Sequence, residues 1–158
     1  MEQAAQQRQQ CRPGQCYALV HVNGEPGGFL VGIAIRDAAG PPLYTTSRVV
    51  PARTPTEAAV QGAAYAHTAA YELGARKLDV FVDDAQACEI LAGAVPAPEE
   101  MSKAYFHART SARKLGTVRA RRMPAQLAQG LECFARARPR PCRRRPGTLS
   151  LFGGEDAA

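Results

Sequence analysis

The chain has 158 residues, 46% of them hydrophobic, and a formal net charge of +6. This length supports one domain with a substantial core but is short for two. Every apolar run falls below the roughly 18 residues of a membrane span, and the polar, Gln-rich start does not resemble a secretory signal, so we expect no membrane protein, collagen-like chain or fully disordered chain.

Three strands are predicted near the N-terminus, after a polar leader over residues 1–15 that we expect to be disordered. The strands cover residues 17–22, 29–36 and 43–50, which have the residue composition of strands and are separated by turn residues. Asn23-Gly24 marks the first turn, and Pro26-Gly27-Gly28 extends it. Short connections between consecutive strands predict an antiparallel meander.

A helix with clear start and stop signals is predicted over residues 55–73. Thr54 is a suitable N-cap, Pro55 fits the first helical position, and Glu57 completes a capping-box pattern three residues after the cap. The segment between is rich in alanine, and Gly74 is a typical residue just past a helix end.

Alternating strands and helices are predicted for the rest of the domain. The expected elements are a strand over 78–82, a short helix over 85–92 capped by Asp84, a loop over 93–98, a helix over 99–115, a strand over 117–122 and a helix over 124–137. We place one domain at residues 16–137 and a flexible basic tail at 138–158.

Positive charge is concentrated in one stretch of the chain. Residues 103–145 hold 13 basic side chains against Glu132 alone, whereas residues 1–102 hold 7 basic and 11 acidic ones. Such a block indicates a polyanionic partner, with nucleic acid as the first candidate. The planar guanidinium group of arginine can bind two phosphate oxygens at once. The candidate phosphate-binding residues are Arg109, Arg113, Lys114, Arg119, Arg121, Arg122, Arg143, Arg144 and Arg145.

Cysteine and histidine give weaker signals. The five cysteines form no CxxC pair, which argues against a disulfide scaffold and favours a reduced, cytoplasmic protein. Their spacings are poor for zinc. His21, His67 and His107 lack partners at any useful spacing, so we expect ordinary structural roles for them.

The order of the predicted strands and helices, together with the local sequence, resembles that of type 1 ribonuclease H domains. The stretch PGGFLVGIAIRDAAG at 26–40 resembles the family's hairpin, and the stretch at 54–86 resembles its long helix, Glu-Leu-Gly turn and following strand. Ala128-Gln129-Gly130-Leu131 resembles part of its last helix. The resemblance covers residues 17–137 and implies an α/β, ribonuclease H-like fold with a mixed five-stranded sheet.

Catalysis in that family uses four carboxylates that hold two magnesium ions. The resemblance places Asn23, Ala59, Asp83 and Gln129 at those positions, so only Asp83 keeps a carboxylate. Because two dications facing one anion are poorly held, we expect no cofactor and a catalytically inactive protein. In the alternative, an active ribonuclease H would hold magnesium or manganese with Asp83, Glu57 and Asp84.

A short apolar segment in the tail resembles another motif. Thr148-Leu149-Ser150-Leu151-Phe152 matches four of five positions of the bacterial sliding-clamp-binding pentapeptide. Leu151 and Phe152 would fill a pocket on the clamp, and Leu149 would contact its rim. The sequence therefore predicts a nucleic-acid-binding accessory protein, with clamp recruitment as a further partner. A pure interaction domain whose arginines keep it soluble is the remaining alternative.

Overall fold

The computed structural model describes residues 15–37 and 42–124, and the elements in these ranges confirm the predicted order as far as the last strand. The strands are β1 (Gln15–Glu25), β2 (Gly28–Asp37), β3 (Tyr44–Val50), β4 (Lys77–Val82) and β5 (Thr117–Arg122). The helices are α2 (Pro55–Glu72), α3 (Ala85–Leu91), the 3₁₀ turn η1 (Glu99–Met101) and α4 (Ser102–Ala112). The predicted leader over 1–15 lies outside the described residues except for Gln15, which begins β1 and so is not part of a leader. Of the helix predicted over 124–137 only Pro124, which is not helical, is described, and the basic tail lies outside the described residues.

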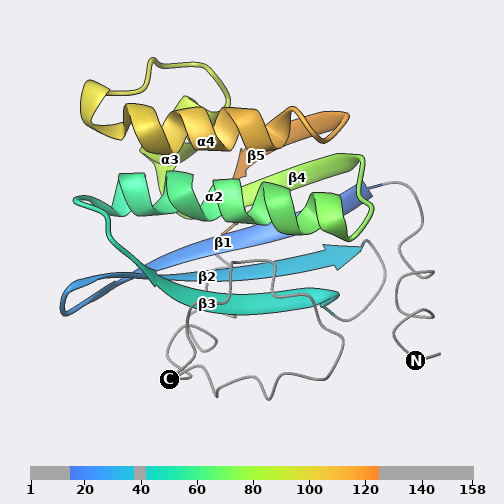
Figure 1. Ribbon diagram of the computed structural model, residues 1–158, viewed down its shortest axis with the longest axis horizontal. Helices are drawn as coiled ribbons and strands as arrows, with labels where there is room; N and C mark the ends of the chain where they lie inside the picture. The colour runs from blue at the N-terminus through green and yellow to red at the C-terminus, as the bar shows by residue number, and fades with distance from the viewer. Residues whose placement is uncertain (1–14, 38–41, 125–158) are drawn as a thin grey trace.

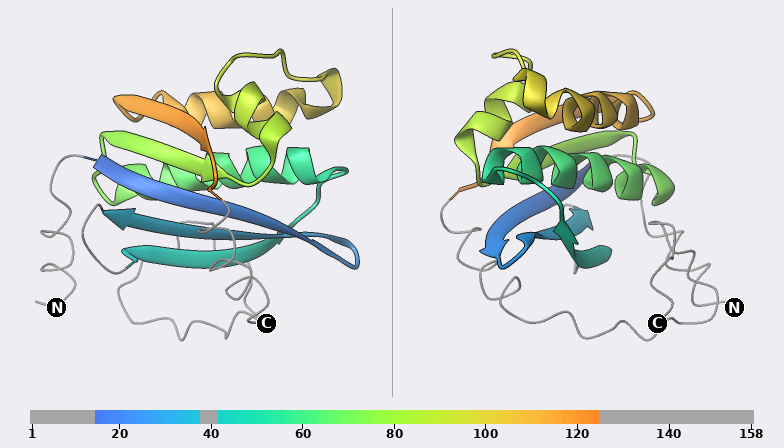
Figure 2. Two further views of the ribbon diagram at one scale, coloured as in Figure 1. Left: turned by 180° about the vertical axis from the view of Figure 1, so that it is seen from behind. Right: turned by 60° about the vertical axis from the view of Figure 1, so that its left-hand side comes forward.

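The five strands form one mixed sheet in the order β3-β2-β1-β4-β5. β1 pairs antiparallel with β2, and β2 with β3, whereas β4 runs parallel to both β1 and β5. The three described helices lie on one face of this sheet (Figure 1, Figure 2). We call the opposite face the far face.

The first hairpin is tighter than the sequence predicted. β1 continues through Asn23 and Gly24, which pair with Leu30 and Phe29, so the expected turn at Asn23-Gly24 is wrong. Glu25 pairs with Gly28, which leaves Pro26 and Gly27 as the two-residue connection. Proline followed by a glycine at φ +88° has the residue pattern of a type II turn, in which the second residue needs a positive φ.

The start of α2 confirms the predicted cap in a shifted form. Thr54 Oγ1 accepts a hydrogen bond from Glu57 N at 3.1 Å. The Glu57 carboxylate accepts from Arg53 N at 2.9 Å, one residue before the position that a standard capping box uses. Both side chains therefore stabilise the helix N-terminus.

The main core lies between α2 and the sheet. Alternate residues of β1, β2 and β4 point to α2, among them Val20, Val31 and Val80, and all three are almost fully buried. α2 also contacts α4, so alanines are buried on two of its sides. Small side chains let the helix approach both neighbours, which explains its alanine-rich composition.

None of the helices in the described ranges combines the length and hydropathy that crossing a bilayer requires.

Candidate functional site

The middle of β1 and the carboxyl end of β4 bring two titratable side chains together on the far face. His21 Nδ1 lies 2.6 Å from Asp83 Oδ2, and the same oxygen accepts a hydrogen bond from Val22 N at 3.3 Å. Parallel pairing of Val20 with Val82 places the two residues at the same level of neighbouring strands. The expectation that His21 has no partner was wrong, because strand pairing joins residues that are far apart in the sequence.

The other residues that the resemblance assigned to carboxylate positions lie apart from this pair or outside the described residues. Asn23 lies on β1 beyond His21, opposite Leu30 of β2. Ala59 is fully buried in an apolar cluster with Ala87 and Ile90. Gln129 lies outside the described residues. From β1, therefore, the side chain that contacts Asp83 is a histidine.

Glu57 and Asp84, the carboxylates of the alternative metal site, have local partners. Asp84 Oδ1 accepts from Ala87 N at 2.8 Å, which confirms it as the N-cap of α3. Thr56 Oγ1 also donates to the Asp84 carboxylate, at 3.1 and 3.2 Å to its two oxygens. Within residues 15–37 and 42–124, no three histidine, cysteine or acidic side chains are grouped closely enough to hold a metal ion. This donor set does not fit a pair of magnesium ions.

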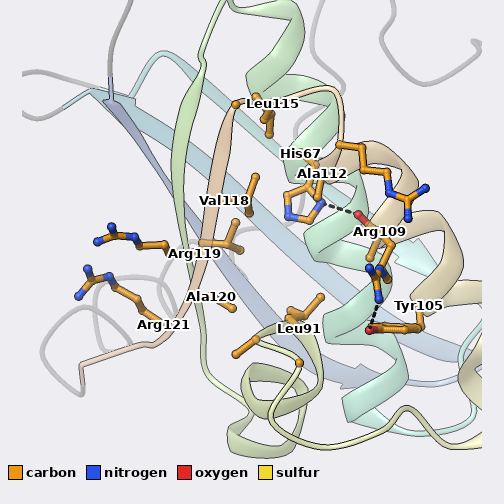
Figure 3. Close-up of a pocket in the computed structure, with 16 residues that line it drawn as sticks. His67, Leu91, Tyr105, Arg109, Ala112, Leu115, Val118, Arg119, Ala120 and Arg121 are labelled. Atoms are coloured by element: carbon orange, nitrogen blue, oxygen red, sulfur yellow. Dashed lines mark hydrogen bonds between the residues drawn. The ribbon is translucent and has the colours of Figure 1, made fainter.

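The predicted basic residues fall into groups on different sides of β5. Arg119 and Arg121 alternate with Val118 and Ala120 along the strand, so they project to the far face, as Figure 3 shows. Arg109, Arg113 and Lys114 belong to α4 or follow it on the helix side and are exposed. Arg143, Arg144 and Arg145 lie outside the described residues, as do Leu149, Leu151 and Phe152.

The acidic groups of the far face already have cationic or donor partners. Arg121 Nε lies 3.5 Å from Asp79 Oδ2, and Gln15 Nε2 donates to the same oxygen at 3.3 Å. Asp83 has its contacts with His21 and Val22. The far face at β4 and β5 therefore combines internally paired carboxylates with two exposed guanidinium groups, an arrangement that suits an anionic ligand better than a dication.

This structure is similar in fold to solved ribonuclease H domains. Ribonuclease H1 from Halobacterium salinarum superposes with a TM-score of 0.66 at 15% identity, over 73% of this chain and 90% of that chain. The N-terminal RNase H domain of Rv2228c from Mycobacterium tuberculosis, solved as a fusion with maltose-binding protein, gives 0.66 at 16%, over 73% and 91%. LC11-RNase H1 in complex with an RNA/DNA hybrid gives 0.63 at 12%, over 72% and 88%.

The sequence itself has no such match. No protein-family profile matches the chain, and no curated protein matches it. The structural likeness, at these identities, shows the fold alone. It confirms the predicted α/β, ribonuclease H-like architecture with its mixed five-stranded sheet.

Proposed function

We propose that this chain is a ribonuclease H-like protein that binds nucleic acid through its phosphate backbone and acts as an accessory factor without cleaving it. The proposal depends on the far face, where Asp83 contacts His21 and where Arg119 and Arg121 of β5 are exposed. A structural neighbour was solved with an RNA/DNA hybrid, which makes that duplex the first ligand to test.

Binding by these arginines predicts a strong dependence on salt. Each exposed arginine–phosphate contact contributes roughly 0.5–1 kcal/mol, so losing two weakens binding about tenfold. We expect the double variant Arg119→Gln, Arg121→Gln to show that loss, and to reduce the slope of log affinity against log salt by about 2. Glutamine keeps a donor for Asp79. Fluorescence anisotropy with a labelled RNA/DNA hybrid and with double-stranded DNA, from 50 to 200 mM salt, would measure both quantities.

The matched control removes two charges elsewhere. The double variant Arg53→Ala, Lys103→Ala changes exposed residues at the start of α2 and on α4, and it should bind like the wild type. If it weakened binding as much as the far-face variant does, net charge rather than the far face would account for the affinity. If the protein bound no nucleic acid at all, the alternative function, a protein-interaction domain, would remain.

A metal-dependent ribonuclease H is the second candidate, because one carboxylate oxygen at the site has no partner. Asp83 Oδ1 is buried and has no hydrogen-bond partner among the described residues. An active enzyme would cleave an RNA/DNA hybrid in magnesium or manganese, and Asp83→Asn would abolish the cleavage. We expect no Asp83-dependent cleavage in either metal, even at high protein concentration. Cleavage that Asp83→Asn removes would contradict the proposed accessory role.

Recruitment to a sliding clamp is proposed for the tail on its sequence alone. Replacing Leu151 and Phe152 by alanine should abolish association with a bacterial sliding clamp in a pull-down assay and leave the thermal unfolding of the domain unchanged. Equal association of the full chain and of a chain ending at Pro146 would remove the tail from this role.

A further inference from the structure

A pocket on the helix side of β5 takes no part in the proposed function. It encloses about 880 Å³ between α4, the end of α3 and β5 (Figure 3). Small and apolar side chains form its floor, among them Ala108, Ala112, Val118 and Ala120. This volume falls within the range of small-molecule sites, about 300–1,000 Å³.

His67 of α2 contributes a hydrogen-bond acceptor to this pocket. Its side chain is 3% exposed, and its Nδ1 lies 3.1 Å from both Ala108 O and Ser111 Oγ. A carbonyl oxygen can only accept, so Nδ1 carries the proton and Nε2 keeps its lone pair. Figure 3 shows this second ring nitrogen on the side facing Val118, across the pocket. Burial lowers the pKa of His67 to about 4, so the ring stays neutral at pH 7.

Two arginines one helical turn apart supply positive charge to the same pocket. Arg109 and Arg113 of the α4 region both line it. Arg109 Nη1 donates to Tyr105 Oη at 3.3 Å, and its guanidinium lies 5.8 Å from the centroid of that ring. Neither arginine forms an ion pair within the part of the chain that the structure describes. Their charge is therefore available to an anion.

We propose that this pocket binds a nucleoside phosphate. The guanidinium groups of Arg109 and Arg113 would hold the phosphate, for which a pair of planar forks is well suited. The apolar floor would contact the faces of the base, and His67 Nε2 would accept a hydrogen bond from a base amine. The partly buried apolar floor, the single acceptor and the cationic rim match these three parts of one ligand, the base faces, the base amine and the phosphate. The ligand is either a free nucleotide or one nucleotide at the end of a strand.

Titration with adenosine 5′-monophosphate, followed by calorimetry and by amide NMR shifts, tests this assignment. We expect saturable binding with shifts concentrated at residues 116–120 and in α4, and at least tenfold weaker binding of adenosine and of inorganic phosphate. The variant Arg109→Gln, Arg113→Gln should weaken binding of the nucleotide at least tenfold. His67→Asn keeps a donor towards Ala108 O and lacks Nε2. This variant should therefore bind the nucleotide more weakly and bind inorganic phosphate as the wild type does.

Controls separate this pocket from the far face. Arg119 and Arg121 also border the pocket, but Figure 3 shows their side chains directed away from it. Arg119→Gln, Arg121→Gln should therefore bind the nucleotide like the wild type, as should Arg53→Ala, Lys103→Ala. The test of the pocket is then independent of binding to the nucleic-acid backbone. A 5′-phosphorylated tetranucleotide that binds at least as well as the mononucleotide would identify a strand end as the ligand, and weaker binding would identify the free nucleotide. No saturable binding, equal affinity for inorganic phosphate, or no effect of the Arg109 and Arg113 changes would overturn the proposal.

Discussion

Replacing Gly62 by valine should destabilise the domain by about 3 kcal/mol or more, because α2 has no room for a larger side chain there. A Cβ at this position would lie 2.6 Å from Val20 Cγ1 and 2.7 Å from Val31 Cγ1. Both valines belong to the packed core between α2 and the sheet. Alanine is a milder test, since its gain in helix propensity of about 1 kcal/mol offsets part of the steric cost. We expect Gly62→Ala to be destabilised by about 1 kcal/mol net.

Urea denaturation followed by circular dichroism measures these changes. Gly24→Ala is the matched control, because a Cβ there meets nothing within 4 Å, and its free energy of unfolding should stay near that of the wild type. Combining Gly62→Ala with Val31→Ala opens space, so the pair should lose less stability than the two single changes together. A Gly62→Ala protein more stable than the wild type, or strictly additive effects in the pair, would contradict the close contact between α2 and the sheet.

Acid should destabilise the protein through His67, by about 2 kcal/mol between pH 7.5 and pH 5. Burial lowers the pKa of His67 from 6.5 to about 4 in the folded protein. As the pH falls below 6.5, the unfolded chain gains a proton that the folded chain takes up only near pH 4. The free energy of unfolding therefore decreases as the pH falls from about 6.5 to about 4. The stability that comes from the neutral His67 is fully present only above pH 6.5.

Comparison with His67→Asn isolates this contribution. Asparagine does not titrate and can still donate to Ala108 O, so the variant should show a smaller loss of stability between pH 7.5 and pH 5. His21 and His107 are present in both proteins, so the comparison reports the change at His67 alone. Urea midpoints and slopes at the two pH values give the required free energies. An identical pH dependence in the two proteins would show that His67 is not kept neutral by burial.

Several elements were predictable because their signals are local. Thr54 and Glu57 marked the start of α2, and Asp84 marked the start of α3, since a cap acts on backbone groups within three or four residues. The predicted position of the first turn was wrong. Asn23-Gly24 is a common turn sequence, yet the pairing of β1 with β2 continues through it to Glu25 and Gly28, which leaves Pro26-Gly27 as the connection.

The candidate site was only partly predictable. The resemblance singled out Asp83, and the structure places it at the carboxyl end of β4, as expected. It also directed attention to Asn23, whereas the β1 side chain in contact with Asp83 is His21. Which residue of one strand lies level with a residue of another depends on strand register, which composition and spacing do not specify.

The sequence by itself determined the order and type of the elements as far as β5 and the basic character of the second half. The tertiary structure decided how those residues are grouped. It divided the arginines between the two sides of β5, joined His21 to Asp83, and placed His67 beside Arg109 and Arg113 around one pocket. The physical reason is that strand pairing and the packing of α2 against α4 join residues that are distant along the chain. Side-chain alternation then directs successive residues of β5 to opposite faces of the sheet.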